Sequence, residues 1–341
     1  MRQVAITRHG APDVLEAREA PDPTPADGEV RISVRAAGVN FADILARLGL
    51  YPDAPAPPVV VGYEVAGHID AVGPGVRHRH EGDHIMALTR FGGYADSVVV
   101  PAAFTFPVPQ RLSDAEAAAV PVNYLTALIA LYRLANLTAG ETALIHNAAG
   151  GVGIAAIQLA RLRRAVIIGT ASATKHDALR TFGVDHSIDY RHADVGDAVR
   201  ELTNGRGVDV ILEPRGGRAL AESYRLLAPL GRMVIFGVSD VVSGERRSWW
   251  RAAATVMRMP SFRPLSLMNH NRGVLGFNLG HLWSETRQLT AAMDVLLGEF
   301  DAGRLHPVVA RTFPLERAAD AHRFVQSRSN IGKVVLTCAR S

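Results

Sequence analysis

The stretch Thr142–Gly153, TALIHNAAGGVG, decides the fold of this chain. It begins with a short apolar run typical of a strand, and the helix-forming run IAAIQLARL follows it at 154–162. The order of strand, glycine-rich turn and helix is the one that a dinucleotide-binding site requires. Small residues in such a turn allow the tight bend, the approach of a pyrophosphate to bare backbone and the close packing of helix on strand. The residues expected to do this are Gly150, Gly151, Val152 and Gly153.

Strands and helices alternate after this turn. Ala148 stands where the dinucleotide pattern has its first glycine, so the turn needs support from its context. The expected strands are 165–170, 184–188, 208–212 and 232–236, and the expected helices are 173–182, 195–203 and 218–227. This alternation predicts an α/β fold with a doubly wound parallel (Rossmann) sheet. An α/β domain with a purely structural glycine turn is the alternative.

The sequence before the turn has a different pattern, with short predicted strands, many prolines and several glycine turns. Its expected strands are 29–36, 64–72, 83–88 and 95–100. This spacing predicts a small β-rich domain, to which the helical periodicity of 286–300 and the strand 333–336 are also assigned. We therefore expect a β-rich domain over 1–122 and 281–341 and a dinucleotide-binding domain over 123–280.

The composition is that of an ordinary soluble globular protein, with 48% hydrophobic and 21% charged residues. The net charge is +4, but the arginines are scattered and no basic run contains interleaved aromatics, so no nucleic-acid partner is expected. Lys175 and Lys333 are the only lysines among the 37 basic residues, so a lysine in this chain is a candidate for a functional role. The single Cys338 excludes an intrachain disulfide. No signal core and no unbroken membrane-spanning run is found, which favours a cytoplasmic protein.

Several motifs occur in order along the chain. They are VNFAD at 39–43, GLY at 49–51, GYE at 62–64, the glycine turn, GTAS at 169–172, IDY at 188–190, GVDV at 207–210 and GKVVL at 332–336. Together they resemble the quinone oxidoreductase branch of the medium-chain dehydrogenase/reductase superfamily over essentially the whole length. Within that branch, 240–280, with GFNLG at 276–280, is most similar to the vesicle amine transport protein homologues. The resemblance implies a GroES-like catalytic domain and a homodimer paired through the sheet edge at 274–277.

The cofactor is expected to be NADPH. An NAD-specific site has an acid at the end of the second strand, whereas this chain has GTAS at 169–172 and then Lys175. A hydroxyl and a cation suit the 2'-phosphate of NADPH, and the resemblance implies Ser172, Lys175 and Tyr190 as its ligands. Alternatively, Ser172 is a helix N-cap, Lys175 a solvated helix residue and Tyr190 a packing residue.

No metal is expected. In zinc-dependent relatives three residues hold the catalytic zinc. The positions of this chain that resemble them are Ala37, Tyr63 and a position near Asn123, and these supply no thiolate or imidazole. The histidines of 78–84 lie in a polar turn, where such residues more often solvate than chelate. Hydride would then pass to an acceptor that is already electrophilic, such as a quinone or an α,β-unsaturated carbonyl.

The resemblance also implies the residues around the nicotinamide. Asn40 would orient the cofactor or the substrate, or it is an ordinary turn residue. Tyr51 and Tyr63 are either proton donors to a developing oxyanion or wall residues. Leu45 stands where some quinone reductases have a tyrosine, which puts quinone preference in question. The other positions expected on the nicotinamide side are Thr126, Phe236, Gly237, Phe277 and Asn330.

The sequence thus predicts an NADPH-dependent, zinc-independent reductase of small hydrophobic electrophiles. One alternative is an enoyl or acyl-thioester reductase, whose charged substrate would need a basic cleft mouth. Another is a redox-inactive NADPH-binding protein with a lipid- or partner-binding role. The basic and aromatic run 246–251, RRSWWR, is predicted to lie in a core or interface helix, with a membrane contact or a lid as alternatives.

Overall fold

The computed structural model describes residues 1–242 and 244–338. Their contacts divide the chain into two compact units. The first unit comprises 1–125, 244–247 and the C-terminal part from Leu282, and the second comprises 126–242 and 248–281. The first unit is therefore assembled from segments far apart in the sequence, whereas the second is nearly continuous.

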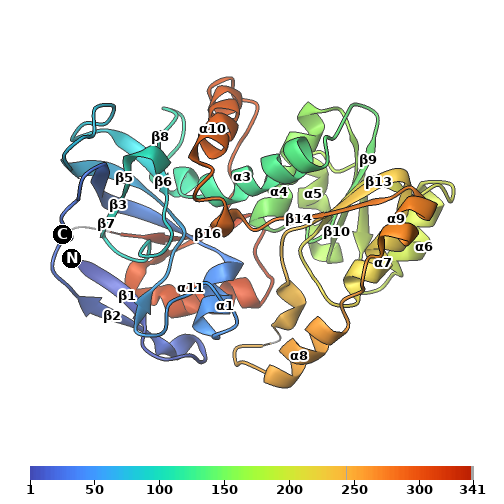
Figure 1. The fold of residues 1–341 in the computed structure, drawn as a ribbon, viewed down its shortest axis with the longest axis horizontal. Coiled ribbons are helices and arrows are strands. Elements are labelled where there is room, and N and C mark those ends of the chain that lie inside the picture. The colour runs from blue at the N-terminus through green and yellow to red at the C-terminus, as the bar shows by residue number, and fades with distance from the viewer. Residues whose placement is uncertain (243, 339–341) are drawn as a thin grey trace. The chain divides into compact units, whose positions relative to one another are not determined.

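The second unit contains a six-stranded parallel sheet with the order β11-β10-β9-β12-β13-β14 (Figure 1). The chain starts at the centre, proceeds outward to β11 and then returns to the other side of β9. This reversal of direction makes the sheet doubly wound, as the sequence predicts. The strands are β9 Thr142–Ile145, β10 Val166–Ala171, β11 His186–Asp189, β12 Val208–Glu213, β13 Leu227–Ile235 and β14 Gly273–Gly276.

The helices of this unit begin and end near the predicted bounds. Helix α4 packs on β9 and β10, because its apolar residues, Ile154 and Ile157 among them, are buried against the sheet. The predicted helix 173–182 is divided into a 3-10 turn, Ala173–Lys175, and α5. The helices are α4 Gly151–Leu162, α5 His176–Thr181, α6 Val195–Leu202, α7 Ala219–Arg225, α8 Trp249–Met257 and α9 Pro264–His270; α3 Pro121–Leu128 leads into them.

The first unit is β-rich. A three-stranded sheet has the order β2-β1-β4, and a seven-stranded sheet has the order β15-β16-β3-β5-β6-β8, with β7 paired to β3. Strand β16 is antiparallel to β3 and brings the C-terminal part of the chain back to this unit. The strands are β1 Arg2–Ile6, β2 Leu15–Glu19, β3 Glu29–Val39, β4 Val59–Val60, β5 Glu64–Val72, β6 His84–Leu88, β7 Ser97–Pro101, β8 Thr105–Pro107, β15 Val309–Pro314 and β16 Lys333–Thr337. The helices are α1 Phe41–Arg47, α2 Asp114–Ala117, α10 Thr286–Asp301 and α11 Ala318–Gln326.

Helix α8, which contains the second half of the run 246–251, is not a core helix. It buries no residue, and Trp250 and Met257 are 89% and 84% exposed. The core interpretation is wrong because apolar side chains of α8 and α9, Leu265 and Met268 of α9 among them, are exposed to solvent. An interface role for this helix stays a prediction. No helix among the described residues is long and apolar enough to cross a membrane.

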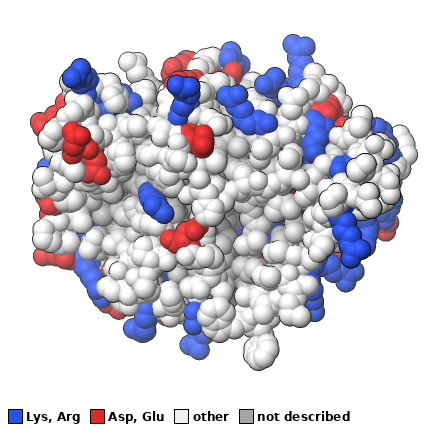
Figure 2. Space-filling view, in the orientation of Figure 1, with Lys and Arg blue, Asp and Glu red and all other residues white. Residues whose placement is uncertain are grey.

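Charge on the molecular surface is scattered over most of the face drawn in Figure 2. Lys and Arg side chains gather at the right-hand edge of that view, over the elements that Figure 1 labels α6, α7 and α9. This grouping lies on the unit that carries the glycine turn.

Candidate active site

The glycine turn joins β9 to α4 in the second unit. Gly150 precedes the first turn of α4. A Cβ on Gly153 would lie 2.4 Å from the carbonyl oxygen of Ala148 and 2.5 Å from that of Asn147, so the turn and the helix leave no room for a side chain. A Cβ on Gly169 would lie 3.1 Å from the Ala148 methyl group, which therefore packs over a glycine of the neighbouring strand. The alanine in place of the first glycine is thus accommodated, and the turn keeps the bare backbone that a pyrophosphate needs.

The residues predicted to bind the 2'-phosphate follow the ends of β10 and β11. These strands run parallel with Ala171 opposite Asp189, so Ser172 and Tyr190 leave the sheet at the same edge. Ser172 occupies an N-cap position, but its side chain makes no cap hydrogen bond, so the capping alternative is not realised. Lys175 lies in the 3-10 turn that follows, and Tyr190 is 39% exposed. This arrangement matches the charge and hydrogen-bonding needs of a phosphate.

A buried polar network that the sequence analysis missed lies under the glycine turn. Arg215 donates to both carboxylate oxygens of Glu213, at 2.8 and 2.6 Å. It also donates to His146 Nε2 at 3.1 Å. Since arginine can only donate, His146 Nε2 accepts, and the imidazole proton is on Nδ1, 3.2 Å from Thr170 Oγ1. The Ser223 hydroxyl donates to Glu213. The network ties the ends of β9, β10 and β12 together beneath the turn.

The electrostatics of this network keep the histidine neutral and the glutamate charged. Burial lowers the pKa of His146 to about 4; Glu213 acts against this shift and the nearby Arg215 adds to it. Burial by itself would raise the pKa of Glu213, but the hydrogen bonds and the charge of Arg215, together with the Ser223 hydroxyl, outweigh it and lower that pKa. A polar residue directly after each of two apolar strands was the only sequence signal of this network.

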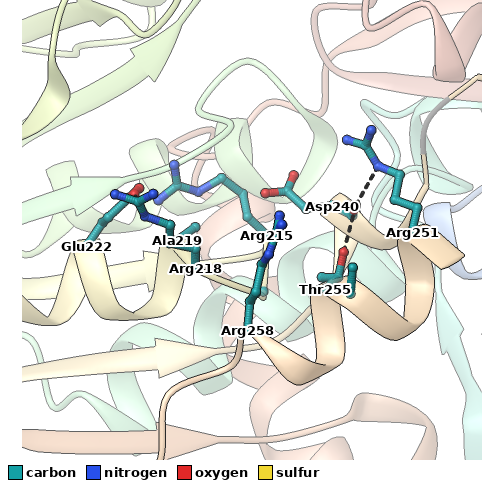
Figure 3. Close-up of a pocket in the computed structure, with 11 residues that line it drawn as sticks. Arg215, Arg218, Ala219, Glu222, Asp240, Arg251, Thr255 and Arg258 are labelled. Carbon is teal, nitrogen blue, oxygen red and sulfur yellow. Dashed lines mark hydrogen bonds and ion pairs between the residues drawn. The ribbon is translucent and has the colours of Figure 1, made fainter.

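The second unit also contains a pocket of about 350 Å³ beside the loop after β12 (Figure 3). Arg215 and Arg218 in its wall are paired with Glu213 and Glu222. Figure 3 shows Arg258 extending from the end of α8 toward the loop that carries Arg215. Among the described residues, no ion pair joins Arg258 to an acid, and the lining has four arginines against the two acids Glu222 and Asp240, so its net charge is positive. The other lining side chains that matter here are Arg251, Thr255 and Asp240.

Backbone hydrogen bonds place this pocket next to the strand end predicted to face the nicotinamide. The N–H groups of Ser239 and Asp240 donate to the carbonyl oxygens of Pro214 and Arg215, both at 2.9 Å. Phe236 and Gly237, which directly follow β13, therefore lie in the same strand-end region. Phe277 follows β14, and its N–H donates to Ile235 at 3.1 Å. Of the other predicted positions, Thr126 belongs to this unit and Asn330 to the first.

The first unit contains a second buried network, around Asn40. Lys333, 3% exposed, donates to Asn40 Oδ1 at 2.6 Å and forms an ion pair with Glu64. Asn40 Nδ2 donates to Glu64 Oε1 at 3.0 Å, and the backbone N–H of Val122 donates to Glu64 Oε2 at 2.7 Å. Asn123 Oδ1 lies 3.5 Å from the Lys333 Nζ. The sequence analysis predicted Asn40 but not Lys333 or Glu64, whose contact depends on the pairing of β16 with β3.

Asp43 anchors Asn40 from the first turn of α1. Its carboxylate accepts the backbone N–H groups of Asn40 at 2.7 Å and Gly62 at 2.9 Å, and the Tyr94 hydroxyl at 3.2 Å. Burial raises the pKa of Asp43 to about 7, although these two backbone groups and the charge of Lys333 act against the shift. The carboxyl group therefore holds a proton in the folded chain that it loses in the unfolded chain near pH 4.

Asp43 should make stability depend on pH. The folded chain binds this proton more tightly, so the contribution of Asp43 to the free energy of unfolding is full below about pH 4 and falls until about pH 7. In Asp43→Asn this fall is expected to disappear, while the lost hydrogen bonds lower stability at every pH. Urea midpoints of both proteins from pH 4 to 8 measure the difference. Parallel pH profiles would contradict the shifted pKa.

Tyr63 and Tyr51 lie together in the same unit, with ring centroids 6.0 Å apart in an edge-to-face arrangement. The Tyr63 hydroxyl is buried and has no hydrogen-bond partner among the described residues. Burial, with a smaller effect of the Asp43 charge, raises the pKa of Tyr63 well above its ordinary value. The hydroxyl therefore stays neutral and can donate a hydrogen bond, but it is a poor source of a full proton.

The residues at the predicted zinc positions offer no thiolate or imidazole. The Tyr63 hydroxyl stays a neutral phenol, which is a poor metal ligand, and the Ala37 side chain has no ligand atom. The positively charged Lys333 ammonium lies near Asn123. Among the described residues no group of three or more His, Cys, Asp or Glu side chains could hold a metal ion. In the histidine-rich turn, His84 Nε2 instead lies 2.7 Å from Asp114 Oδ1.

The fold finds counterparts among known proteins. Residues 26–110 match the model of the alcohol dehydrogenase GroES-like domain, and residues 182–336 match that of the zinc-binding dehydrogenases. The synaptic vesicle membrane protein VAT-1 homolog of Rattus norvegicus is 41% identical over 98% of this chain and 84% of its own length. The chain belongs to the medium-chain dehydrogenase/reductase superfamily. Both the family assignment and the GroES-like fold predicted from the motifs are thereby confirmed.

Solved structures of medium-chain reductases share the fold over the whole chain. The Escherichia coli quinone oxidoreductase complexed with NADPH is 30% identical, with a TM-score of 0.87, over 99% of this chain and 100% of that one. CurK enoyl reductase is 30% identical, with a TM-score of 0.85, over 98% of each chain. The chain is thus an oxidoreductase of this superfamily with a nicotinamide-dinucleotide domain.

Proposed function

We propose that this medium-chain oxidoreductase uses NADPH, without a metal, to reduce quinones or α,β-unsaturated carbonyl compounds. The observation that carries the proposal is the environment of Lys333, whose ammonium stands among Glu64, Asn40 and Asn123. The ammonium would repel a divalent cation placed next to it. The three predicted zinc positions supply no thiolate or imidazole whose bonds to the metal could offset that repulsion. Acceptors that need no Lewis acid are therefore favoured.

The residues of the first unit supply hydrogen bonding for such an acceptor. NADPH supplies the hydride when it is bound. The acceptor oxygen gains negative charge as hydride arrives, so a preorganised donor stabilises the transition state. The unpartnered hydroxyl of Tyr63 is suited to this role, and the proton that completes the reaction then comes from water. Tyr51 packs against the Tyr63 ring and holds it in place.

The function is tested by oxidation of NADPH at 340 nm with a panel of quinones, enones and acyl thioesters. We expect quinones or enones to be turned over, and we expect the rate of NADPH oxidation to stay the same after exhaustive treatment of the protein with chelators. Tight NADPH binding without turnover of any acceptor would instead support a redox-inactive role.

Lys175 should select NADPH over NADH. Since Lys175 and Ser172 follow the second strand in place of an acid, Lys175→Ala is expected to raise the Kd of NADPH about tenfold or more, because a charge-assisted phosphate contact is lost. The Kd of NADH should change less than about twofold. Isothermal titration with both cofactors measures this. Equal weakening of the two cofactors would contradict the assignment.

The arginine pocket supports a second candidate function, the reduction of an enoyl thioester on a phosphate-bearing carrier. A guanidinium without an acidic partner is suited to a phosphate, and this pocket adjoins the predicted nicotinamide side of the sheet. Arg258→Ala is then expected to raise KM for crotonyl-CoA about tenfold. KM for the crotonyl thioester of N-acetylcysteamine, which carries no phosphate, should stay the same. Arg225→Ala, an exposed arginine outside the pocket, is the matched control.

We also propose that the protein is a cytoplasmic homodimer. Strand β14 is the last in its sheet, so its outer edge has no partner among the described strands. Pairing of two β14 edges would cover this apolar strand. Light scattering of the purified protein tests the dimer directly.

A further inference from the structure

The end of β11 places a carboxylate beside the end of β10. Asp189 is the last residue of β11 and lies opposite Ala171, the last residue of β10, in the parallel register. Neighbouring strands of a sheet are about 4.8 Å apart. In a doubly wound sheet the adenosine ribose of a dinucleotide lies at the end of the second strand, which is β10 here. Asp189 is therefore one strand away from the expected place of the ribose 2'-oxygen.

His192 is hydrogen-bonded to this carboxylate. Asp189 Oδ1 accepts the backbone N–H of Arg191 at 3.1 Å, and Oδ2 lies 2.6 Å from His192 Nδ1. The hydrogen bond from His192, with a smaller effect of the Arg191 N–H, holds the pKa of Asp189 below its ordinary value, so this carboxylate is ionised and can only accept. His192 Nδ1 therefore carries a proton. The His192 side chain is 81% exposed, so its ring can also take up a second proton from solvent.

Neighbouring segments carry further charged groups. The turn after β10 contributes Lys175, and His176 follows it, with its ring donating to a backbone oxygen of β10 at 3.2 Å. Arg191 and Tyr190 belong to the turn after β11 itself. The acids in the first turns of α5 and α6, which pack on β11, have partners of their own. These are Arg180 for Asp177, the backbone N–H of Asp197 for Asp194, and Arg200 for Asp197. Beside the carboxylate, His192 is the titratable side chain in direct contact.

We propose that Asp189 and His192 form a pH-dependent specificity element of the cofactor site, in which the carboxylate disfavours the 2'-phosphate of NADPH and protonated His192 cancels this effect. The inference rests on the proposed function, because it takes the dinucleotide as the ligand. With neutral His192 the pair has one net negative charge, which repels a phosphate. With protonated His192 it has none. Histidines change charge between about pH 5 and 8, so the pair favours the phosphorylated cofactor more at the acidic end of that range.

The test compares His192→Gln with the wild type at pH 6 and pH 8. Titration calorimetry with NADP+ and NAD+, which differ only in the 2'-phosphate, gives each Kd without any acceptor or turnover. Glutamine can still donate to Asp189 but cannot take up a charge. At pH 6 the Kd of NADP+ is expected to rise about fivefold, because one positive charge near the phosphate is lost. At pH 8, and for NAD+ at either pH, the change should be less than about twofold.

Asp189→Asn/His192→Gln distinguishes cancellation of a charge from a direct contact of His192 with the phosphate. Asparagine still accepts the Arg191 N–H, and the pair no longer has any charge. The double variant should regain the wild-type Kd of NADP+ at pH 6 and bind NADP+ about fivefold more tightly than the wild type at pH 8. His186→Gln is the matched control, because it removes an exposed histidine at the opposite end of β11 and should leave both Kd values unchanged.

Two results would overturn the inference and leave the proposed function standing. One is a wild-type Kd of NADP+ for His192→Gln at pH 6. The other is a double variant that binds NADP+ at pH 6 as weakly as His192→Gln does, because His192 would then act on the phosphate directly. If Asp189 only stabilised its turn, the variants would lose thermal stability without any change in the ratio of the two Kd values. If the wild type binds neither cofactor, the proposed function fails as well.

Discussion

Glu64→Gln is expected to lower the free energy of unfolding by about 3 kcal/mol or more. The carboxylate is fully buried and is the only acid in contact with the equally buried Lys333 among the described residues. The substitution keeps the shape of the side chain but leaves an ammonium in the protein interior without a countercharge. Desolvation of that charge is no longer offset, and urea unfolding at pH 7 measures the loss.

Two further variants separate the charge effect from a packing effect. Glu64→Gln/Lys333→Met is expected to recover most of the lost stability, because replacing a buried ion pair by neutral groups is often close to neutral. Glu222→Gln breaks an exposed pair with Arg218 and should cost less than about 1 kcal/mol. A double variant that is less stable than Glu64→Gln would show that the ammonium is not the cause.

Gly153→Ala is expected to raise the Kd of NADPH by about thirtyfold and to cost about 2 kcal/mol of stability. The added methyl would lie 2.4 Å from one backbone oxygen and 2.5 Å from another, so the turn and α4 must move apart. Neither oxygen belongs to a flexible side chain that can yield. Movement of α4 displaces the free N–H groups that the phosphates would meet. Calorimetric titration and urea unfolding check the two effects.

Gly298→Ala is the matched control for this prediction. Gly298 lies inside α10, and no atom comes within 4 Å of a Cβ built on it. Alanine there should leave NADPH binding unchanged and stabilise the helix by about 0.5–1 kcal/mol. If both glycine variants behaved alike, helix propensity and not close packing would explain the result.

The fold was predictable because its signals are local. The apolar run, glycine turn and helix at 142–162 lie in one short stretch, and each following strand is bounded by turn residues. The environment of α8 was not predictable in this way. Its Trp249 and Trp250 are typical of a buried or covered helix, yet they are 59% and 89% exposed.

The residues of the candidate site also differ in whether a local sequence signal marks them. Ser172, Lys175 and Tyr190 could be predicted because they lie in or near short motifs that follow strands and carry the family resemblance; their binding of the 2'-phosphate stays a prediction. Lys333 could not, although it is the rarer kind of residue in this chain, because its contact with Asn40 joins positions 293 residues apart. Only strand pairing brings them together, and no local pattern encodes that register.

The pairing of β16 with β3 has a consequence for how the chain is made. The second unit leaves the ribosome almost in one piece and can fold while synthesis continues. The first unit must wait for β16, so Glu64 and the polar groups around Asn40 are made early and remain without the Lys333 ammonium until position 333 has been synthesised. During that interval the edge of β3 that β16 will cover is open, and an open strand edge can pair with strands of other chains.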